Sequence, residues 1–166
     1  MTPPLQPEEQ ARVLIDEQLT QAGWHVCDRQ DIDLVNQYGN AVREVVMDAG
    51  HGRADYLLYV DKRVVGVIEA KPSGTTLSGV QWQSAMYAAG LPEAYRETAV
   101  LKDDRLPFIF EASGTETHYT NGFDPNPRAR KIFNFPQPET LARITRDAEA
   151  NPDAPTWRAR VHNMPP

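Results

Sequence analysis

The chain has 166 residues, 40% of them hydrophobic and 24% charged, with a formal net charge of -6 at pH 7. This composition is typical of one globular domain with its own hydrophobic core, and no apolar stretch reaches the roughly 18 residues that a membrane-spanning helix needs. A single cysteine, Cys27, excludes an internal disulfide framework and a multi-cysteine zinc site. We therefore expect a cytoplasmic protein without a membrane partner, although the acidic balance argues mildly against a nucleic-acid partner.

Hydrophobic periodicity predicts helices and strands in the order α-β-β-β-α-β-β-α. The predicted helices cover 8–22, 80–89 and 139–150, and the predicted strands cover 41–47, 54–60, 64–70, 107–112 and 116–120. This order favours an α/β fold with a mixed central β-sheet flanked by helices. We expect residues 1–150 to form the domain and the proline-containing segment 151–166 to be a linker.

The clearest local feature is a β-hairpin. The segments ADYLLYV (54–60) and VVGVIEA (64–70) flank a tight turn at Asp61-Lys62-Arg63. Both strands are apolar on both faces, which indicates a position near the middle of a covered sheet. Pro72 ends the second strand, because proline cannot donate a ladder hydrogen bond.

Charged residues lie where the hairpin strands begin and end. Asp55 opens the first strand, and Glu69 and Lys71, two residues apart and on one face, close the second. Antiparallel pairing brings these ends together, and two carboxylates about 4 Å apart repel by roughly 4 kcal/mol at an effective dielectric constant near 20. A divalent cation reverses this repulsion, and a neighbouring lysine can orient water or stabilise a phosphate. Charged residues are common at strand ends, but Glu69 ends a buried apolar run, which favours a functional role.

These segments resemble the nuclease domain at the N-terminus of the restriction (R) subunit of type I restriction–modification enzymes, in the PD-(D/E)xK nuclease superfamily. The matching segments are 52–58 (GRADYLL), 67–72 (VIEAKP), 83–88 (QSAMYA), 14–16, 22–24, 106–108, 120–122 and 138–141. Segment 83–88 is similar to the Gln-x-x-x-Tyr motif that accompanies this nuclease site. The resemblance covers nearly the whole chain, with two departures. Ala54 stands where proline is common, and Pro72 stands where a basic residue is frequent, which puts one phosphate contact in doubt.

The resemblance implies the roles of the residues at the hairpin ends. Asp55, Glu69 and the backbone carbonyl of Ala70 would bind Mg²⁺, for which Mn²⁺ can substitute. Lys71 would be the catalytic lysine. The implied activity is that of a type I site-specific deoxyribonuclease that cuts double-stranded DNA.

Further residues and partners follow from the same resemblance. Gln83 and Tyr87 would position DNA, and an acid on the first helix often completes such sites, with Glu9 and Glu17 both candidates. The implied partners are motor domains of the same chain, toward which the linker 151–166 would lead, and the modification and specificity subunits. The sequence contains no Gly-x-x-x-x-Gly-Lys-Ser/Thr phosphate loop, so ATP is expected to bind only to the full-length subunit. The isolated chain is therefore expected to be a weak nuclease.

Two alternatives stay open from the residues alone. One is another PD-(D/E)xK DNA nuclease, of the RecB type or dependent on modified DNA. The other is a non-catalytic docking module that retains the fold, although the presence of Asp55, Glu69 and Lys71 disfavours it.

Overall fold

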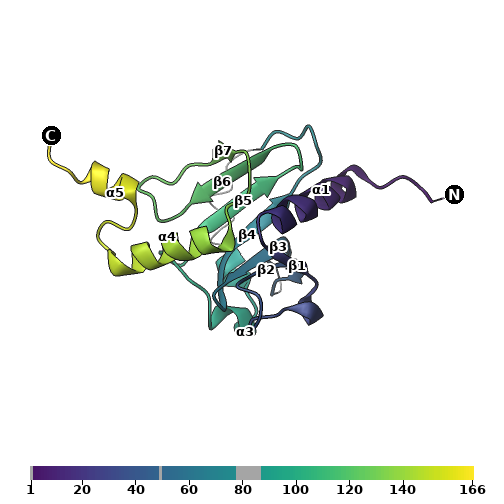
Figure 1. The fold of residues 1–166 in the computed structure, drawn as a ribbon, viewed down its shortest axis with the longest axis horizontal. Coiled ribbons are helices and arrows are strands. Elements are labelled where there is room, and N and C mark those ends of the chain that lie inside the picture. The colour runs from purple at the N-terminus through teal and green to yellow at the C-terminus, as the bar shows by residue number, and fades with distance from the viewer. Residues whose placement is uncertain (1, 49, 78–86) are drawn as a thin grey trace.

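The computed structural model describes residues 2–48, 50–77 and 87–166. Within these residues the strands form one sheet in chain order, β1 to β7 (Figure 1). The strands are β1 (His25–Cys27), β2 (Gly39–Val46), β3 (Arg53–Val60), β4 (Arg63–Ala70), β5 (Phe108–Ala112), β6 (Thr117–Asn121) and β7 (Arg130–Ile132). The pairs β1–β2 and β4–β5 are parallel and the others antiparallel, so the prediction of a mixed sheet is confirmed.

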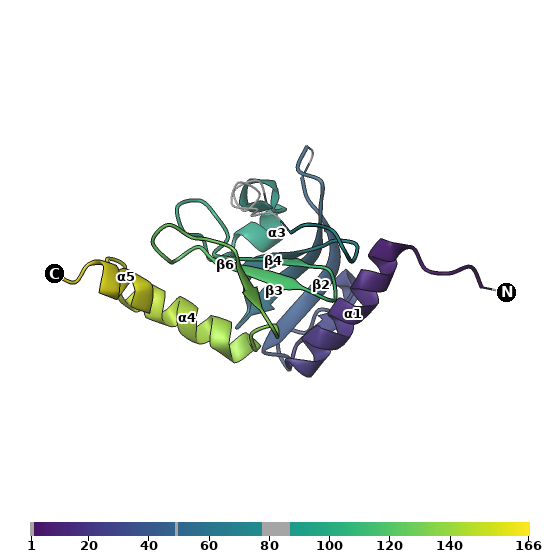
Figure 2. The same cartoon turned by 90° about the horizontal axis from the view of Figure 1, so that it is seen from above.

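Helices cover both faces of the sheet. They are α1 (Pro7–Gln21), α3 (Glu93–Arg96), α4 (Pro138–Ala150) and α5 (Trp157–His162), with a 3-10 turn, η1, at Arg29–Asp31. Figure 2 shows α1 and α4 on one side of the sheet and α3 on the other. Ile15 of α1 and Leu141 of α4 pack in the first core with Tyr56, whereas Tyr95 of α3 packs in the second with Leu57. The β3–β4 hairpin is therefore buried on both faces, as its sequence predicts.

The hairpin turn is tight and strained. Val60 pairs with Arg63, and the two residues between them, Asp61 and Lys62, have φ of 51° and 65°. Two successive residues with positive φ form the turn type that matches the twist of a hairpin. A β-bulge follows in β4, where Val65 has no partner between the pairs Tyr59–Val64 and Leu58–Gly66.

One glycine permits a close approach between β4 and β5. A Cβ atom on Gly66 would meet the backbone carbonyl oxygen and the Cβ of Phe108. Because neither can move without shifting the strand, a side chain at this position would separate β4 from β5. The parallel pairing of β4 with β5 thus depends on Gly66.

Several sequence predictions differ from the structure in detail. Four short elements carry too few residues for a periodic pattern and were not predicted: the strands β1 and β7, the turn η1 and the helix α3. Residues 87–90 are helical, which agrees with the end of the helix predicted at 80–89, and residues 80–86 of that prediction lie outside the described part of the chain. Segment 151–166, which we predict to be a linker, contains α5. The other helix and strand boundaries agree within two residues.

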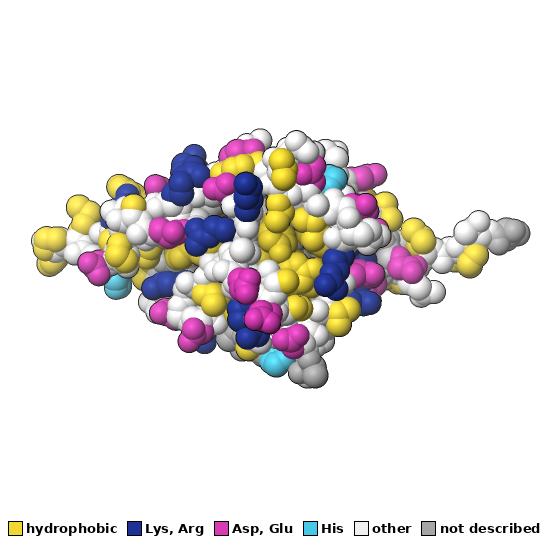
Figure 3. All heavy atoms as spheres, turned by 90° about the horizontal axis from the view of Figure 1, so that it is seen from below, with side chains coloured by type: hydrophobic (Ala, Val, Ile, Leu, Met, Phe, Trp, Pro, Cys, Tyr) yellow, Lys and Arg dark blue, Asp and Glu magenta, His cyan; other side chains and the backbone are white. Residues whose placement is uncertain are grey.

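The surface carries a mixture of charges. Figure 3 shows one face on which Lys and Arg side chains are interspersed with Asp and Glu around an apolar centre. This face is therefore not a single basic field of the kind that grips a phosphate backbone. No helix in the described residues is both long and apolar enough to span a membrane.

Candidate active site

Asp55 lies where β3 and β4 stop pairing. The regular ladder ends at the pair Tyr56–Ile68, and the Asp55 Oδ2 atom instead accepts a hydrogen bond of 2.9 Å from the backbone N–H of Ala70. The carboxylate of Asp55 therefore lies against the segment that carries Glu69 and Lys71. This is the juxtaposition that the two hairpin strands predict.

Glu69 and Lys71 form an ion pair. The Lys71 Nζ atom lies 2.6 Å from Glu69 Oε1, and the two side chains are 34% and 16% exposed. The hydrogen bond to Glu69 raises the pKa of the Lys71 ammonium group more than burial lowers it, so Lys71 is protonated at neutral pH. The other oxygen, Glu69 Oε2, is buried and accepts no hydrogen bond within the described residues. A buried oxygen without a donor is a ready ligand for a cation.

Arg12 reaches the site from α1. Its Nη2 atom lies 2.6 Å from Asp55 Oδ1, and its Nη1 atom lies 2.8 Å from Glu44 Oε1. Glu8, one helical turn earlier on α1, lies 3.5 Å from the same guanidinium. Both carboxylates are thus neutralised by cations of the chain, Asp55 by Arg12 and Glu69 by Lys71. Sequence reasoning missed Arg12, although the spacing of Glu8 and Arg12 places them on one helix face.

The two glutamates proposed as accessory acids lie elsewhere on α1. Glu9 Oε2 accepts a hydrogen bond of 3.0 Å from the backbone N–H of Gln6 and so caps the helix. Glu17 is exposed. Among the described residues neither contacts Asp55 or Glu69 through a hydrogen bond or ion pair, and Glu8 is the acid of α1 that the structure joins to the site, through Arg12.

A third carboxylate lies beside the site and was also missed. Glu111 of β5 is in register with Glu69 of β4, and it is only 4% exposed. Burial and then the charge of Glu69 raise the pKa of Glu111, while Lys71 and His118 act in the opposite direction. An acid near the end of the apolar segment PFIFEA was the available signal, since Glu69 ends its own apolar run in the same way.

Of the two residues expected to position DNA, only Tyr87 can be placed. Its hydroxyl has a pKa above the usual value because of burial and the charges of Glu69, Asp55 and Glu111. Tyr87 therefore lies near all three carboxylates. Gln83 lies outside the described residues.

The donor set fits a Mg²⁺ ion with few protein ligands. Residues 2–48, 50–77 and 87–166 contain no group of three or more His, Cys, Asp or Glu side chains arranged to hold one ion. Mg²⁺ commonly takes one or two carboxylates and completes its shell with water and phosphate oxygens. Asp55, Glu69 with its Oε2 atom free of hydrogen bonds, and the carbonyl of Ala70 are the groups here that could supply such donors.

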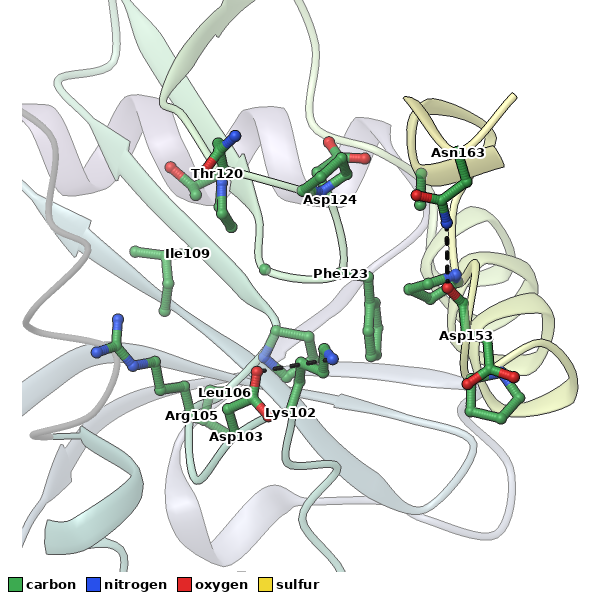
Figure 4. A pocket seen from close by; sticks show the side chains of 18 residues that line it. Lys102, Asp103, Arg105, Leu106, Ile109, Thr120, Phe123, Asp124, Asp153 and Asn163 are labelled. Atoms are coloured by element: carbon green, nitrogen blue, oxygen red, sulfur yellow. Dashed lines mark hydrogen bonds and ion pairs between the residues drawn. The ribbon is translucent and has the colours of Figure 1, made fainter. Parts of the chain in front are cut away.

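A cavity of about 580 Å³ lies apart from this site (Figure 4). It is lined by Leu106 and Ile109 at the start of β5, by Phe123 after β6, and by residues near α5 such as Asn163. Glu111 lies near the opposite end of β5. The cavity includes none of the predicted site residues.

Comparisons with known proteins identify the class of the fold. The chain is similar to "The fragment structure of a putative HsdR subunit of a type I restriction enzyme from Vibrio vulnificus YJ016", with a TM-score of 0.54 and 20% sequence identity. The match covers 84% of this chain and 25% of that one, so this chain spans about a quarter of the length of that relative. At this identity the likeness concerns the fold, which is that of the restriction-enzyme fragment.

The family follows from the sequence. Residues 35–123 match the family described as "Type I restriction enzyme EcoKI endonuclease subunit second domain", and the chain belongs to that family. The matched segment contains Asp55, Glu69, Lys71 and Glu111. A comparison with curated proteins found no match. The resemblance seen in the sequence motifs is therefore confirmed for the family.

Proposed function

We propose that this chain is a Mg²⁺-dependent endonuclease domain that cuts double-stranded DNA within a type I restriction subunit. The observation that carries the proposal is the contact of the Asp55 carboxylate with the Ala70 backbone, beside the Glu69–Lys71 ion pair. Two carboxylates and an ammonium group at one strand end are the parts that phosphodiester hydrolysis needs. Membership of the family favours this function over a RecB-type or modification-dependent nuclease.

Each residue has a defined role in this proposal. Asp55, Glu69 and the Ala70 carbonyl would hold the metal ion, either Mg²⁺ or Mn²⁺. When bound, the ion would lower the pKa of a ligated water and neutralise charge on the scissile phosphate. Lys71 would orient the attacking water or stabilise negative charge on the phosphate, because its raised pKa keeps it cationic. Tyr87 and Gln83 would position the DNA next to these groups.

The charge distribution bears on how the domain would work with its partners. The net charge of -6 and the mixed charges on the face in Figure 3 provide little general attraction for DNA. In this proposal the grip on DNA comes from ATP-dependent motor domains of the complete subunit and from the modification and specificity subunits, in the cytoplasm. The domain itself ends near Ala150, and on its own it cuts DNA weakly.

Plasmid nicking tests the proposal. The complete subunit, assembled with its modification and specificity partners, is incubated with supercoiled plasmid, ATP and Mg²⁺ or Mn²⁺. Asp55→Ala and Lys71→Ala are expected to abolish cutting while translocation along DNA continues. Lys62→Ala, at the exposed hairpin turn, is the matched control for Lys71 and should cut normally. Cutting by both substituted complexes would place the nuclease centre elsewhere and leave this domain a docking element.

A further inference from the structure

The strand at one edge of the sheet carries a concentrated positive charge. β7 ends the sheet, and one of its sides pairs with no strand in the described part of the chain (Figure 1). Residues 125–138 contain the cations Arg128, Arg130 and Lys131 and no Asp or Glu, in a chain whose net charge is -6. All three cations are exposed, and the one ion pair that they form among the described residues joins Lys131 to Glu116 at 3.9 Å. This edge is therefore a positive surface on an acidic chain.

An exposed aromatic ring completes this surface. Phe133 directly follows β7 and is 97% exposed, more than any other large hydrophobic residue in the described part of the chain. Phe135, two residues further on, is instead buried in the first core. Cations that can meet phosphates, next to an aromatic ring that can pack on a base, are typical of nucleic-acid contacts. We call Arg128, Arg130, Lys131 and Phe133 the basic rim.

The register of the sheet aligns the basic rim with the candidate active site. Glu69 of β4 pairs with Glu111 of β5. Glu111 pairs with His118 of β6, and His118 pairs in turn with Lys131 of β7. Directly opposite residues of neighbouring strands project from the same face, so Lys131 lies on the face of the sheet that carries Glu69. Three steps between strands separate the two residues by about 14 Å.

The direction of the strands adds Phe133 to this alignment. β5 runs parallel to β4, and two antiparallel pairings lead from β5 to β7, so β4 and β7 run in the same direction. Lys71 comes two residues after Glu69, and Phe133 comes two residues after Lys131. Phe133 therefore stands at the same end of the sheet as Lys71.

A DNA duplex bound at the candidate active site would reach the basic rim. Double-stranded DNA advances about 3.4 Å per base pair, so a separation of roughly 14 Å corresponds to about four base pairs. One phosphate can therefore lie at Lys71 while others lie at the rim. An acidic protein could also meet three cations, but the alignment of the rim with Glu69 and Lys71 favours DNA.

We infer that the basic rim is a DNA-contact surface, which holds the duplex about four base pairs from the phosphate that is cut. The inference rests on the proposed function, because it takes double-stranded DNA as the substrate and the β4 end as the cutting site. The three cations of the rim would contact phosphates, and Phe133 would pack against a base or a sugar. Phosphate contacts fix the position of a duplex without reading its sequence, so the rim would orient DNA that other parts of the enzyme select.

The salt dependence of DNA binding tests the cations. The chain is titrated into a labelled duplex of about 20 base pairs without divalent metal, and log Kd is plotted against log salt concentration. Each phosphate contact contributes about 0.9 to the slope, so the triple variant Arg128→Gln, Arg130→Gln, Lys131→Gln should lower the slope by about 2 to 3. Exchange of each cation for the other kind (Arg128→Lys, Arg130→Lys, Lys131→Arg) should keep the wild-type slope.

A second group of cations provides the matched control. Lys62, Arg63 and Arg146 lie at the turn end of the β3–β4 hairpin, away from Glu69, and Arg63 and Arg146 line a common pocket. Their replacement by Gln changes the net charge by the same amount. Because cations that touch no phosphate release no counterions, this variant should lower the slope by less than about 1.

The aromatic ring is tested by affinity at constant salt. Phe133→Ala should raise the Kd for the duplex about fivefold or more, because it removes the packing of the ring on a base or sugar. The slope should stay at its wild-type value, since no charge is lost. Trp157→Ala is the matched control, because Trp157 is also an exposed aromatic residue, 73% exposed, and its loss should leave the Kd unchanged.

Urea unfolding checks that the variants fold. The side chains of the basic rim are exposed, so the midpoint of unfolding should stay at the wild-type urea concentration. If the triple variant does not fold, Arg130→Gln alone replaces it and should lower the slope by about 0.9.

Four results would overturn the inference. They are an unchanged slope in the triple variant, an equal fall of the slope in the control group, and a wild-type chain that does not bind the duplex at low salt. The fourth is normal DNA binding by the triple variant together with lost assembly with the modification or specificity subunits, which would make the rim a protein-docking surface.

Failure of the rim is distinguishable from failure of the proposed function. If Asp55→Ala still cuts plasmid in the assembled subunit, the proposed function is wrong, and the position of the rim relative to the cut phosphate falls with it. If Asp55→Ala does not cut and the triple variant keeps the wild-type slope, only the inference about the rim is wrong.

Discussion

Arg12 should compete with a metal ion for Asp55, and its removal should therefore have opposite effects on stability and on metal affinity. The perturbation is Arg12→Met, which keeps the length of the side chain and removes its charge. The guanidinium lies 2.6 Å from Asp55 Oδ1, and the two side chains are only 24% and 14% exposed. At an effective dielectric constant of 20, an attraction at this distance is roughly 6 kcal/mol before desolvation.

The net effect on stability is smaller than this attraction. Breaking a fully buried pair by removing one partner costs about 3–5 kcal/mol, and exposed pairs contribute about 0–1 kcal/mol. Because the Arg12–Asp55 pair lies between these cases, we expect Arg12→Met to lower the free energy of unfolding by about 2 kcal/mol in the absence of metal. Arg63→Met is the matched control. Arg63 lies at the same distance, 2.6 Å, from Glu149, but both side chains are more than 40% exposed, and its loss should cost less than about 1 kcal/mol.

Urea unfolding with and without Mg²⁺ checks the reasoning. A ligand at 100 times its Kd stabilises the folded state by about 2.7 kcal/mol, and a tighter Kd adds to this value. With the arginine gone, Asp55 Oδ1 is free for the ion, so the deficit of Arg12→Met should shrink when Mg²⁺ is added, whereas that of Arg63→Met should not change. An equal deficit for Arg12→Met at both Mg²⁺ concentrations would refute the competition between Arg12 and the metal.

Three further outcomes test the fold. Lys62→Gly should raise the free energy of unfolding by about 1 kcal/mol in urea titrations, because glycine removes the strain of a positive φ, whereas Lys62→Ala should give no gain. Gly66→Ala should lower the free energy of unfolding by about 3 kcal/mol or more, because its Cβ would meet the Phe108 backbone. Gly74→Ala is the control, since a Cβ there has no atom within 4 Å, and it should lower the free energy of unfolding by only about 1 kcal/mol. Equal losses for the two variants would contradict the close approach of β4 and β5. Burial raises the pKa of the Cys27 thiol to about 11, so at pH 8 the folded chain should react with a thiol reagent about 100-fold more slowly than the urea-unfolded chain. Since the folded state disfavours the thiolate, the wild type should also lose stability relative to Cys27→Ala as the pH rises from 9 to 11, and a flat difference would count against the raised pKa.

The hairpin and its end residues could be predicted because their arrangement is local. Two apolar strands separated by a tight turn must pair with each other, and pairing brings Asp55 to the segment of Glu69 and Lys71. The family resemblance then supplied roles for these residues. The mixed sheet likewise followed from the order of the elements.

The missed residues depend on contacts between distant parts of the chain. Arg12 meets Asp55 across 43 positions in the sequence, and Glu111 meets Glu69 through parallel pairing of β4 with β5. The rotation of α1 about its axis is set by burial of Ala11, Ile15 and Leu19 against the sheet, which directs Glu8 and Arg12 toward the site. Periodicity shows that α1 has a buried face, but it does not show which strand ends lie beside that face.

The bulge at Val65 determines which face of the sheet each later residue of β4 occupies. In a hairpin paired without interruption from the Val60–Arg63 pair, Asp55 would stand opposite Ile68, and Glu69 would project from the other face of the sheet. The extra residue moves every later position of β4 by one place, so that Tyr56 pairs with Ile68, and Asp55 and Glu69, one position further along each strand, lie on the same face. Deletion of Val65 should therefore leave an uninterrupted hairpin in which Gly66 still pairs with Leu58 and the two acids remain on one face. The composition of β4 makes it a strand, but the bulge at Val65 sets the face of the sheet on which Glu69 lies.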